Sequence, residues 1–235
     1  MPGGVRSVLF GAAVLSVFAL TVFAQSGVST QTGVHPISGR HFAQVMGAQG
    51  ADWLDRPERV DEEAPDRAIA ALAIPPGATV ADVGAGSGYM TVKLAARVGP
   101  MGRVFANDIQ PEMLRLLGRR LTAERVTNVT LVQGTPDDPK LPLGALDLEL
   151  LVDVYHECSA PQVMLRHLRD SLKADGRLVL LEYRKEDPTI PIRPEHKMSV
   201  AEVKTEVEAE GYALQDVLKI LPRQHIVVFR PLRNM

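Results

Sequence analysis

A glycine-rich run near the middle of the chain contains the residues with the clearest chemical potential. It reads Asp82-Val83-Gly84-Ala85-Gly86-Ser87-Gly88, after a short apolar segment and before a helix-like one. Glycines at alternate positions let the backbone turn tightly and let a ligand approach without meeting a Cβ atom. The free N–H groups at the start of the following helix can receive a polar ligand. The run predicts a ligand site, and an ordinary strand-to-helix turn is the alternative.

The spacing of the run departs from the fingerprint of dinucleotide-binding proteins, G-x-G-x-x-G/A. Tyr89 stands where that fingerprint needs its third small residue. Asp108 lies 22 positions beyond Gly86, at the end of the next predicted strand. A carboxylate there can accept hydrogen bonds from both hydroxyls of a ribose. Together these features favour a nucleoside ligand without a pyrophosphate.

The run Asp82 to Gly88, with Asp108-Ile109 and the segment Pro111-Glu112-Met113-Leu114, resembles the class I S-adenosylmethionine-dependent methyltransferases. The resemblance covers about residues 70–230 and implies S-adenosylmethionine as the cofactor. The cofactor-binding residues that it implies are Asp82, near the methionine amino group, the loop residues Gly84, Ala85, Gly86 and Gly88, and Asp108 with Ile109, at the ribose hydroxyls.

Members of this family often carry an aspartate near the adenine, after the third strand. Thr135 stands at that position here, and Asp137 or Asp138 could take the role. Residues 147–152 resemble the family's fourth-strand motif, and residues 173–178 resemble the turn into the fifth strand. The resemblance therefore implies an adenine site at residues 135–138.

The methyl acceptor is expected beyond the fourth and fifth strands, because ligands of doubly wound sheets lie outside the carboxyl ends of the strands. We expect a small-molecule acceptor, with His156 as its base or as an orienting donor. Tyr155, Glu157 and Tyr183 are expected to shape the pocket. The alternative is that His156 and Glu157 only cap the helix expected after Ser159. The polar stretch 184–197 is either a lid with acceptor contacts or a solvated connector.

The sequence predicts no metal site. Cys158 is the only cysteine, and we interpret it as a buried, inert thiol. The histidines other than His156 show no metal-ligand spacing with one another. Tyr183 and Arg184 stand where a magnesium-dependent catechol-type enzyme would carry acidic and amide ligands.

The elements that must position these residues alternate between strand-like and helix-like segments. Proline at Pro111 begins one of the helices, and capping boxes are expected at Ser159 and Ser199. The pattern predicts an α/β fold, a Rossmann-like, doubly wound, mostly parallel seven-stranded sheet with a C-terminal antiparallel hairpin. The predicted strands cover residues 79–83, 103–106, 129–132, 148–152, 177–183, 214–221 and 225–229, and the predicted helices include 61–73 and 89–98.

The N-terminus predicts a targeting segment. Arg6 is followed by an uncharged apolar run that ends at Ala24, a pattern typical of a cleaved signal peptide. An uncleaved N-terminal membrane anchor is the alternative. We therefore expect a signal or anchor over residues 1–24, a tether and helical extension over 25–60, and the methyltransferase domain over 61–235. The protein would be exported to the periplasm or secreted, or else held at the membrane.

Composition limits the remaining classes of function. The 235 residues suit one domain, and the net charge of −2 argues against a nucleic-acid partner. An aromatic content of 5% argues against a polytopic membrane protein. A single cysteine excludes an internal disulfide framework. Two alternatives to a methyltransferase stay open: a non-catalytic S-adenosylmethionine or nucleoside-binding module on the same fold, and a nicotinamide-dependent oxidoreductase, which Tyr89 disfavours. The sequence does not determine the oligomeric state.

Overall fold

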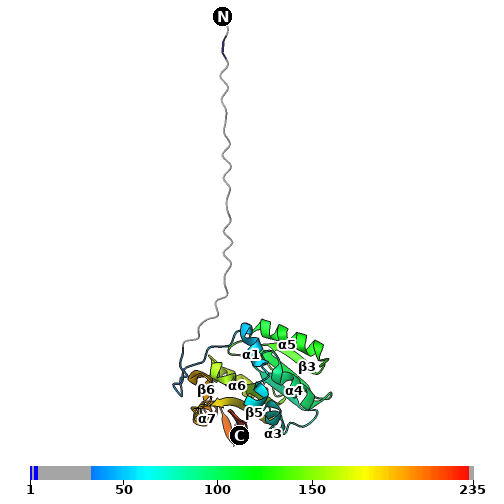
Figure 1. Ribbon diagram of the computed structural model, residues 1–235, viewed down its shortest axis with the longest axis vertical. Helices are drawn as coiled ribbons and strands as arrows, with labels where there is room; N and C mark the ends of the chain where they lie inside the picture. Colours follow the sequence, from blue (N-terminus) through cyan, green and yellow to red (C-terminus); the bar gives the residue numbers. More distant parts are fainter. Residues whose placement is uncertain (2, 5–32, 233–235) are drawn as a thin grey trace.

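A single twisted sheet organises the protein (Figure 1). The computed structural model describes residues 1, 3, 4 and 33–232, and within these residues eight strands form the sheet. Seven of them follow the order β3-β2-β1-β4-β5-β8-β7, and the short β6 pairs with β5. The strands are β1 Thr79–Val83, β2 Arg103–Asp108, β3 Val129–Gln133, β4 Leu146–Val152, β5 Leu172–Arg184, β6 Lys197–Met198, β7 Tyr212–Leu218 and β8 Gln224–Pro231.

The direction of the strands confirms the predicted fold class. Strands β1 to β5 pair in parallel, whereas β8 runs antiparallel to both β5 and β7. Order reverses between β1 and β4, because the chain builds outward from β1 to β3 and then returns to the other side of β1. This reversal is the point at which doubly wound sheets bind ligands.

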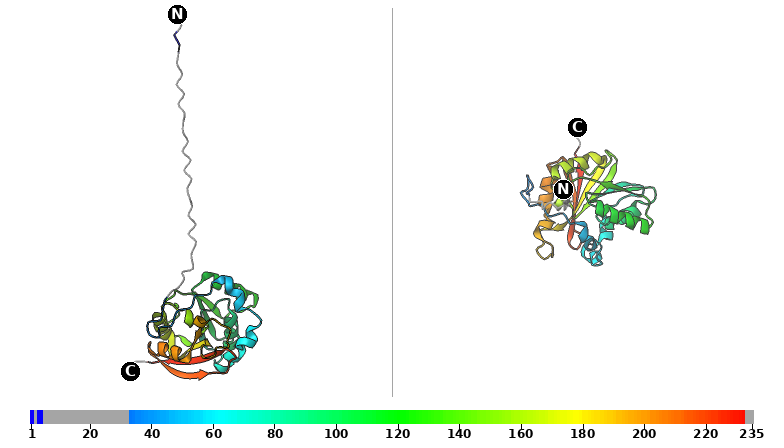
Figure 2. Two further views of the ribbon diagram at one scale, coloured as in Figure 1. Left: turned by 60° about the vertical axis from the view of Figure 1, so that its left-hand side comes forward. Right: turned by 90° about the horizontal axis from the view of Figure 1, so that it is seen from above.

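Helices cover both faces of the sheet (Figure 2). Because side chains alternate along a strand, Val80 faces α3 and α4 while Ala81 faces α6 and α7. Both faces of the central strands are therefore apolar, as a doubly covered parallel sheet requires. The helices and 3-10 turns are η1 Ala48–Gly50, α1 Ala51–Leu54, α2 Arg59–Glu63, α3 Pro65–Ala71, α4 Tyr89–Val98, α5 Pro111–Ala123, η2 Tyr155–Glu157, α6 Pro161–Ser171, η3 Pro194–His196 and α7 Val200–Glu208.

One predicted helix and two predicted capping boxes can be compared with the structure. The helix predicted over residues 61–73 is two helices, because Ala64 takes a left-handed backbone (φ 48°) before Pro65 and a residue before proline avoids the helical region. The capping box predicted at Ser159 is wrong, since Ala160 is the N-cap of α6 and makes no side-chain capping bond. The box at Ser199 is confirmed: Ser199 Oγ accepts from the N–H of Glu202, whose carboxylate accepts from the N–H of Ser199.

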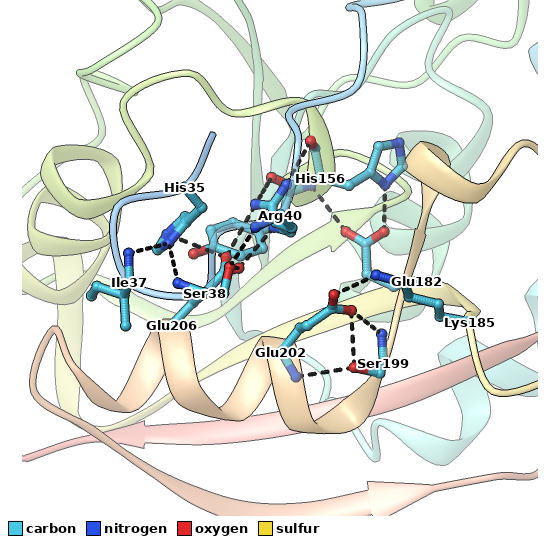
Figure 3. Close-up of polar contacts among 11 residues, drawn as sticks. His35, Ile37, Ser38, Arg40, His156, Glu182, Lys185, Ser199, Glu202 and Glu206 are labelled. Atoms are coloured by element: carbon cyan, nitrogen blue, oxygen red, sulfur yellow. Dashed lines mark hydrogen bonds and ion pairs between the residues drawn. The ribbon is translucent and has the colours of Figure 1, made fainter. Parts of the chain in front are cut away.

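Residues 33–40, the first described part of the tether and extension predicted over residues 25–60, are folded against the domain. His35 and Arg40 are buried, and Arg40 forms a buried ion pair with Glu206 of α7 (Nε to Oε1 2.8 Å, Nη2 to Oε2 3.1 Å; Figure 3). The same guanidinium donates to the carbonyl oxygen of His156 at 3.0 Å. Arg40 thus joins the start of the domain to η2.

The predicted signal or anchor lies almost wholly outside the described residues, which include only positions 1, 3 and 4 of residues 1–24. Within the described part of the chain, no helix combines the length and the apolar character needed to cross a membrane.

Candidate active site

A cavity of about 520 Å³ opens at the carboxyl ends of the parallel strands. Its walls come from the turns after β1, β2, β4 and β5, and residues 45–63 cover it from the N-terminal side. The residues that line it include Met46, Trp53, Arg56, Glu63, Gly84, Gly86, Asp108, Ile109, Gln110, Pro136, Asp153, Val154, His156, Glu157, Tyr183 and His196. A cavity at this position agrees with the rule for doubly wound sheets.

The glycine loop and Asp108 form one half of the cavity. The N–H of Gly86 donates to Asp108 Oδ2 (2.9 Å), and the N–H of Gln110 donates to Oδ1 (2.8 Å). Burial raises the pKa of Asp108, although these two N–H groups favour its charged form. Each carboxylate oxygen keeps a lone pair beyond the bond that it already accepts. Asp108 is therefore held rigidly and can still accept from two hydroxyl groups.

The first position of the loop requires glycine, because the turn after β4 packs directly against it. Gly84 has a left-handed backbone (φ 73°), and a Cβ atom there would lie 2.5 Å from Val154 Cγ2. Gly84 and Gly86 both line the cavity. Together with Ile109 beside Asp108, they fit the nucleoside expected from the sequence.

Three other cofactor residues predicted from the sequence lie outside the cavity wall. Asp82 is buried below the loop, where its Oδ2 accepts from Thr91 Oγ1 at 2.6 Å. Ala85 faces the core, and Gly88 packs so closely on α5 that a Cβ atom would lie 2.1 Å from Leu117 Cδ1. These residues shape the loop from behind, whereas Gly84 and Gly86 present its surface to the cavity.

The structure does not bring the predicted adenine residues into the cavity. Thr135 Oγ1 bonds to Asp137 Oδ1 (2.6 Å) and to the N–H of Asp138 (3.1 Å), so the three residues close a turn on themselves. Pro136 is the member of this turn that lines the cavity. A carboxylate that caps its own turn in this way is not directed at an adenine, which corrects this assignment.

His156 and Glu182 define the opposite half of the cavity. His156 Nδ1 lies 2.5 Å from Glu182 Oε2, and the other oxygen of Glu182 accepts from the N–H of Tyr155 at 3.0 Å (Figure 3). Burial opposes charge on the imidazole, but the attraction and the hydrogen bond of Glu182 raise the pKa of His156 overall. Glu182 thus keeps Nδ1 protonated and leaves Nε2 to face outward.

His196 lies directly beside His156 in the cavity wall. Its Nδ1 lies 3.2 Å from His156 Nε2, and the two rings meet edge to face. Burial and the neighbouring His156 lower the pKa of His196. Glu157 completes the group, and burial raises its pKa to about 7 against the opposing effect of His156. His156 bonds to Glu182 and Glu157 accepts from Met46, and neither side chain caps α6, so the helix-capping alternative for His156 and Glu157 is wrong.

The two predicted tyrosines have different positions. Tyr155 is fully buried in the core, where its ring packs 5.4 Å from the Arg40 guanidinium. The prediction that Tyr155 shapes the pocket is therefore wrong, because its side chain does not line the cavity. Tyr183 does line it, and its hydroxyl donates to Glu63 Oε1 at 2.8 Å. Burial raises the pKa of Tyr183, and the nearby Asp153 and Glu63 add to the shift. Tyr183 therefore connects β5 to the N-terminal cover.

Sequence reasoning missed several residues of the site. Glu182 could have been found, because a lone carboxylate inside the apolar run 178–183 must have a partner if the run is buried. Asp153 Oδ1 has no hydrogen-bond partner within the described chain, and Gln224 Nε2 donates to its other oxygen at 2.7 Å. Burial raises the pKa of Asp153 well above its ordinary value.

The N-terminal cover carried no recognisable motif. Gln110 Nε2 donates to the carbonyl oxygen of Met46 at 2.9 Å, and the N–H of Met46 donates to Glu157 Oε1 at 3.3 Å. Arg56 stacks on the ring of Trp53, 3.8 Å from its centroid. Met46 therefore bridges the two halves of the cavity, a role that only the folded chain reveals.

Comparison with known proteins agrees with this geometry. Residues 80–176 match the family model described as a methyltransferase domain. The chain is 33% identical over 111 residues to the ubiquinone/menaquinone biosynthesis C-methyltransferase UbiE of Ectopseudomonas mendocina, a match that covers 47% of this chain and 43% of the relative. The UbiE protein of Shewanella sp. (strain W3-18-1), which has the same description, is 30% identical to this chain over 155 residues. That match covers 65% of this chain and 51% of the relative. The chain spans about half the length of the curated relatives that it matches.

Solved structures extend the likeness to the whole fold. A SAM-dependent methyltransferase from Aquifex aeolicus superposes with a TM-score of 0.76 at 25% identity, covering 80% of this chain and 100% of the other. In sequence and in fold the chain is thus similar to the class I S-adenosylmethionine-dependent methyltransferases, and this likeness supports S-adenosylmethionine as its cofactor.

The same fold also carries other chemistry. The [4+2]-cyclase SpnF superposes with a TM-score of 0.61 at 15% identity, covering 72% of this chain and 82% of the other. Likeness at that identity describes the fold alone. The reaction must be argued from the residues of the cavity.

Proposed function

We propose that the protein transfers a methyl group from S-adenosylmethionine to a small-molecule acceptor held between the His156–His196 pair and the N-terminal cover. The observation that carries the proposal is that one half of the cavity is lined by the glycine loop and Asp108, and the other half by histidine and carboxylate side chains. A cavity of about 520 Å³ is of a size that suits small molecules. When bound, S-adenosylmethionine supplies an electrophilic methyl group on a sulfonium centre.

The residues of this chain hold and orient that cofactor. Asp108 accepts from the ribose hydroxyls, and the backbone of Gly84 and Gly86 allows the nucleoside to approach closely. Asp153 offers an unpartnered carboxylate oxygen to a cationic amino group at the end of β4. Each of these groups is already held by backbone or core contacts, so little side-chain freedom is lost on binding.

The histidine half would act on the acceptor. His156 and His196 orient its nucleophilic atom, and an imidazole nitrogen accepts the proton when that atom is a protic oxygen or nitrogen. Met46, Trp53 and Arg56 close the cavity and exclude water, which preserves a correctly oriented approach. A ring carbon remains a second kind of acceptor to test, because relatives named C-methyltransferases resemble this chain.

Calorimetric titration of the full-length protein with S-adenosylhomocysteine and with NAD tests the cofactor class. We expect binding of the former alone, and no binding of the sulfur nucleoside would overturn the proposal. Turnover of methyl-labelled S-adenosylmethionine with phenol, thiol, amine and quinone acceptors then separates an enzyme from a binding module. Binding without turnover across that panel favours the module.

The substitution His156→Ala tests the acceptor half separately. We expect turnover to fall about 100-fold while the affinity for S-adenosylhomocysteine changes by less than about twofold. His167→Ala, on the exposed face of α6, is the matched control and should leave both values unchanged. Unchanged turnover of His156→Ala would remove His156 from the reaction.

We also propose that residues 1–24 direct export or anchor the domain at a membrane, which rests on their apolar sequence alone. Fractionation of the expressed protein with mass determination of its N-terminus tests this. A cytosolic protein with an intact N-terminus would contradict both forms of the proposal.

A further inference from the structure

We propose that His156, Glu157 and His196 bind a divalent first-row transition-metal ion, of which zinc is the best fit, at the acceptor end of the cavity. One ligand atom from each residue lies within 4.8 Å of the other two. Two imidazole nitrogens and one carboxylate oxygen are the donors of known catalytic zinc sites, which keep a fourth position open. All three residues line the cavity, so the open position would face the acceptor.

The separation of the two histidine nitrogens suits a shared metal ion. Zinc–nitrogen bonds of about 2.0–2.1 Å at a tetrahedral angle place two nitrogens roughly 3.4 Å apart. His156 Nε2 and His196 Nδ1 are 3.2 Å apart. A single shared proton would also suit this distance, so the third donor decides between the two. Glu157 brings a partly buried carboxylate to the pair, where a cation compensates its charge.

Glu182 has the position of an outer-shell partner. A metal-binding histidine nearly always donates its second ring N–H to a carboxylate or carbonyl, which fixes the tautomer and the ring. Glu182 Oε2 accepts from His156 Nδ1 at 2.5 Å and so leaves Nε2 free to bind the ion. The carboxylate itself is held by the N–H of Tyr155.

The backbone that carries the ligands is fixed before any ion arrives. The carbonyl oxygen of His156 accepts from Arg40 and from the N–H of Ala43, at 3.0 and 3.1 Å. His196 ends η3 directly before β6, whose pairing with β5 places Lys197 beside Tyr183. A site whose ligands are positioned by separate rigid elements needs little rearrangement on binding.

The role of the metal ion in catalysis rests on the proposed methyltransferase function. The binding of the ion to the three residues does not depend on that function. The ion would hold an oxygen or sulfur atom of the acceptor and lower its pKa as a Lewis acid. His156 Nε2 cannot bind the ion and also accept the acceptor's proton, so occupancy by a metal would replace direct proton removal by that atom.

Titration of the untagged, EDTA-treated full-length protein with Co²⁺ and Zn²⁺ tests the site. We expect one equivalent to bind, with the visible absorption of cobalt in a low-coordinate nitrogen and oxygen site, and no competition from Mg²⁺, which prefers oxygen ligands. The absence of a one-to-one complex, or equally tight binding of Mg²⁺, would overturn the proposal.

Variants locate the site within the cavity. His196→Ala and Glu157→Gln should weaken Co²⁺ binding more than 100-fold, and Glu182→Gln should weaken it about 10–100-fold. His167→Ala, away from the cavity, should bind as the unaltered protein does. Unchanged binding by His196→Ala would contradict the proposal.

Titration of the same samples with S-adenosylhomocysteine gives an independent reading. Retained affinity in the variants shows that they are folded. If the unaltered protein binds the metal but not S-adenosylhomocysteine, the proposed function fails and the metal site stands. If the unaltered protein binds S-adenosylhomocysteine but not the metal, the metal site fails and the proposed function stands.

Discussion

The two halves of the cavity differ in how far apart their residues lie in the chain. In the cofactor half, the bond between Gly86 and Asp108 joins residues 22 positions apart, within one strand-helix-strand unit. In the acceptor half, His156 is 26 positions from Glu182 and 40 from His196, and Glu157 is 111 positions from Met46. The contact that fixes Asp108 is therefore local in sequence, whereas the acceptor half depends on the packing of distant segments.

This comparison predicts that long-range contacts matter most for the acceptor half. Arg40→Met leaves Glu206 as a buried charge without its guanidinium partner and removes donors to the carbonyl oxygens of Tyr155 and His156. We expect the free energy of unfolding, measured in urea, to fall by about 3–5 kcal/mol, since breaking a buried pair uncovers a desolvated charge.

Lys204→Met provides the matched control for that substitution. It breaks an exposed pair with Glu208 on the same helix and should lower the free energy of unfolding by only about 0.3–0.5 kcal/mol. Equal effects of the two substitutions would show that the segment around Arg40 does not hold η2 in place.

The cofactor half should respond in affinity rather than in stability. Asp108→Asn keeps the shape of the side chain but exchanges one acceptor for a donor facing the ribose hydroxyls. Hydrogen bonds to charged groups contribute about 1.5–3 kcal/mol each, so the loss corresponds to roughly 100-fold weaker binding of S-adenosylhomocysteine. Calorimetry measures it, and Asp175→Asn, at an exposed position near the start of β5, should bind as before.

A change of less than about threefold for Asp108→Asn would place the ribose elsewhere in the cavity. It would also remove the distinction between the halves, because the cofactor half would then lack the residue on which its identification depends.

The smallest expected effect concerns the carboxylate below the glycine loop. Burial raises the pKa of Asp82 from its ordinary value of 3.8 to about 6, although the Thr91 hydrogen bond opposes this. The folded protein then binds this proton more tightly than the unfolded chain, so stability decreases as the pH rises from about 4 to 6. Asp82→Asn lacks that decrease and keeps an oxygen that accepts from Thr91.

We therefore expect ligand-free Asp82→Asn to be more stable than the unaltered protein at pH 7. A pKa shift of two units corresponds to roughly 3 kcal/mol, and we expect about 1–2 kcal/mol of it to appear as a higher free energy of unfolding. The difference should vanish near pH 4. Thermal unfolding of both proteins across this pH range measures it, and the subtraction removes the contribution of Glu157 and other shared groups. A less stable variant at pH 7 would mean that the charged form of Asp82 is stabilised.

Much of the fold was predictable because its signals are local. The bounds of β1 and α4 agree with the predicted segments, since a short apolar run followed by glycines and a helical period is readable within about twenty residues. The split between α2 and α3 depended on the backbone of Ala64, and the two-residue β6 has too little sequence to carry a pattern.

The amino-acid sequence by itself determined the class of fold, the glycine loop and Asp108, because these lie on one continuous supersecondary unit whose geometry is nearly fixed by residue type. Only the tertiary structure decided the acceptor half. The approach of His196 to His156, the carboxylate of Glu182 behind it and the cover formed by residues 45–63 each depend on which strand edge a distant segment packs against. Spacing along the chain does not contain that information, since burial and pairing in three dimensions select the partners.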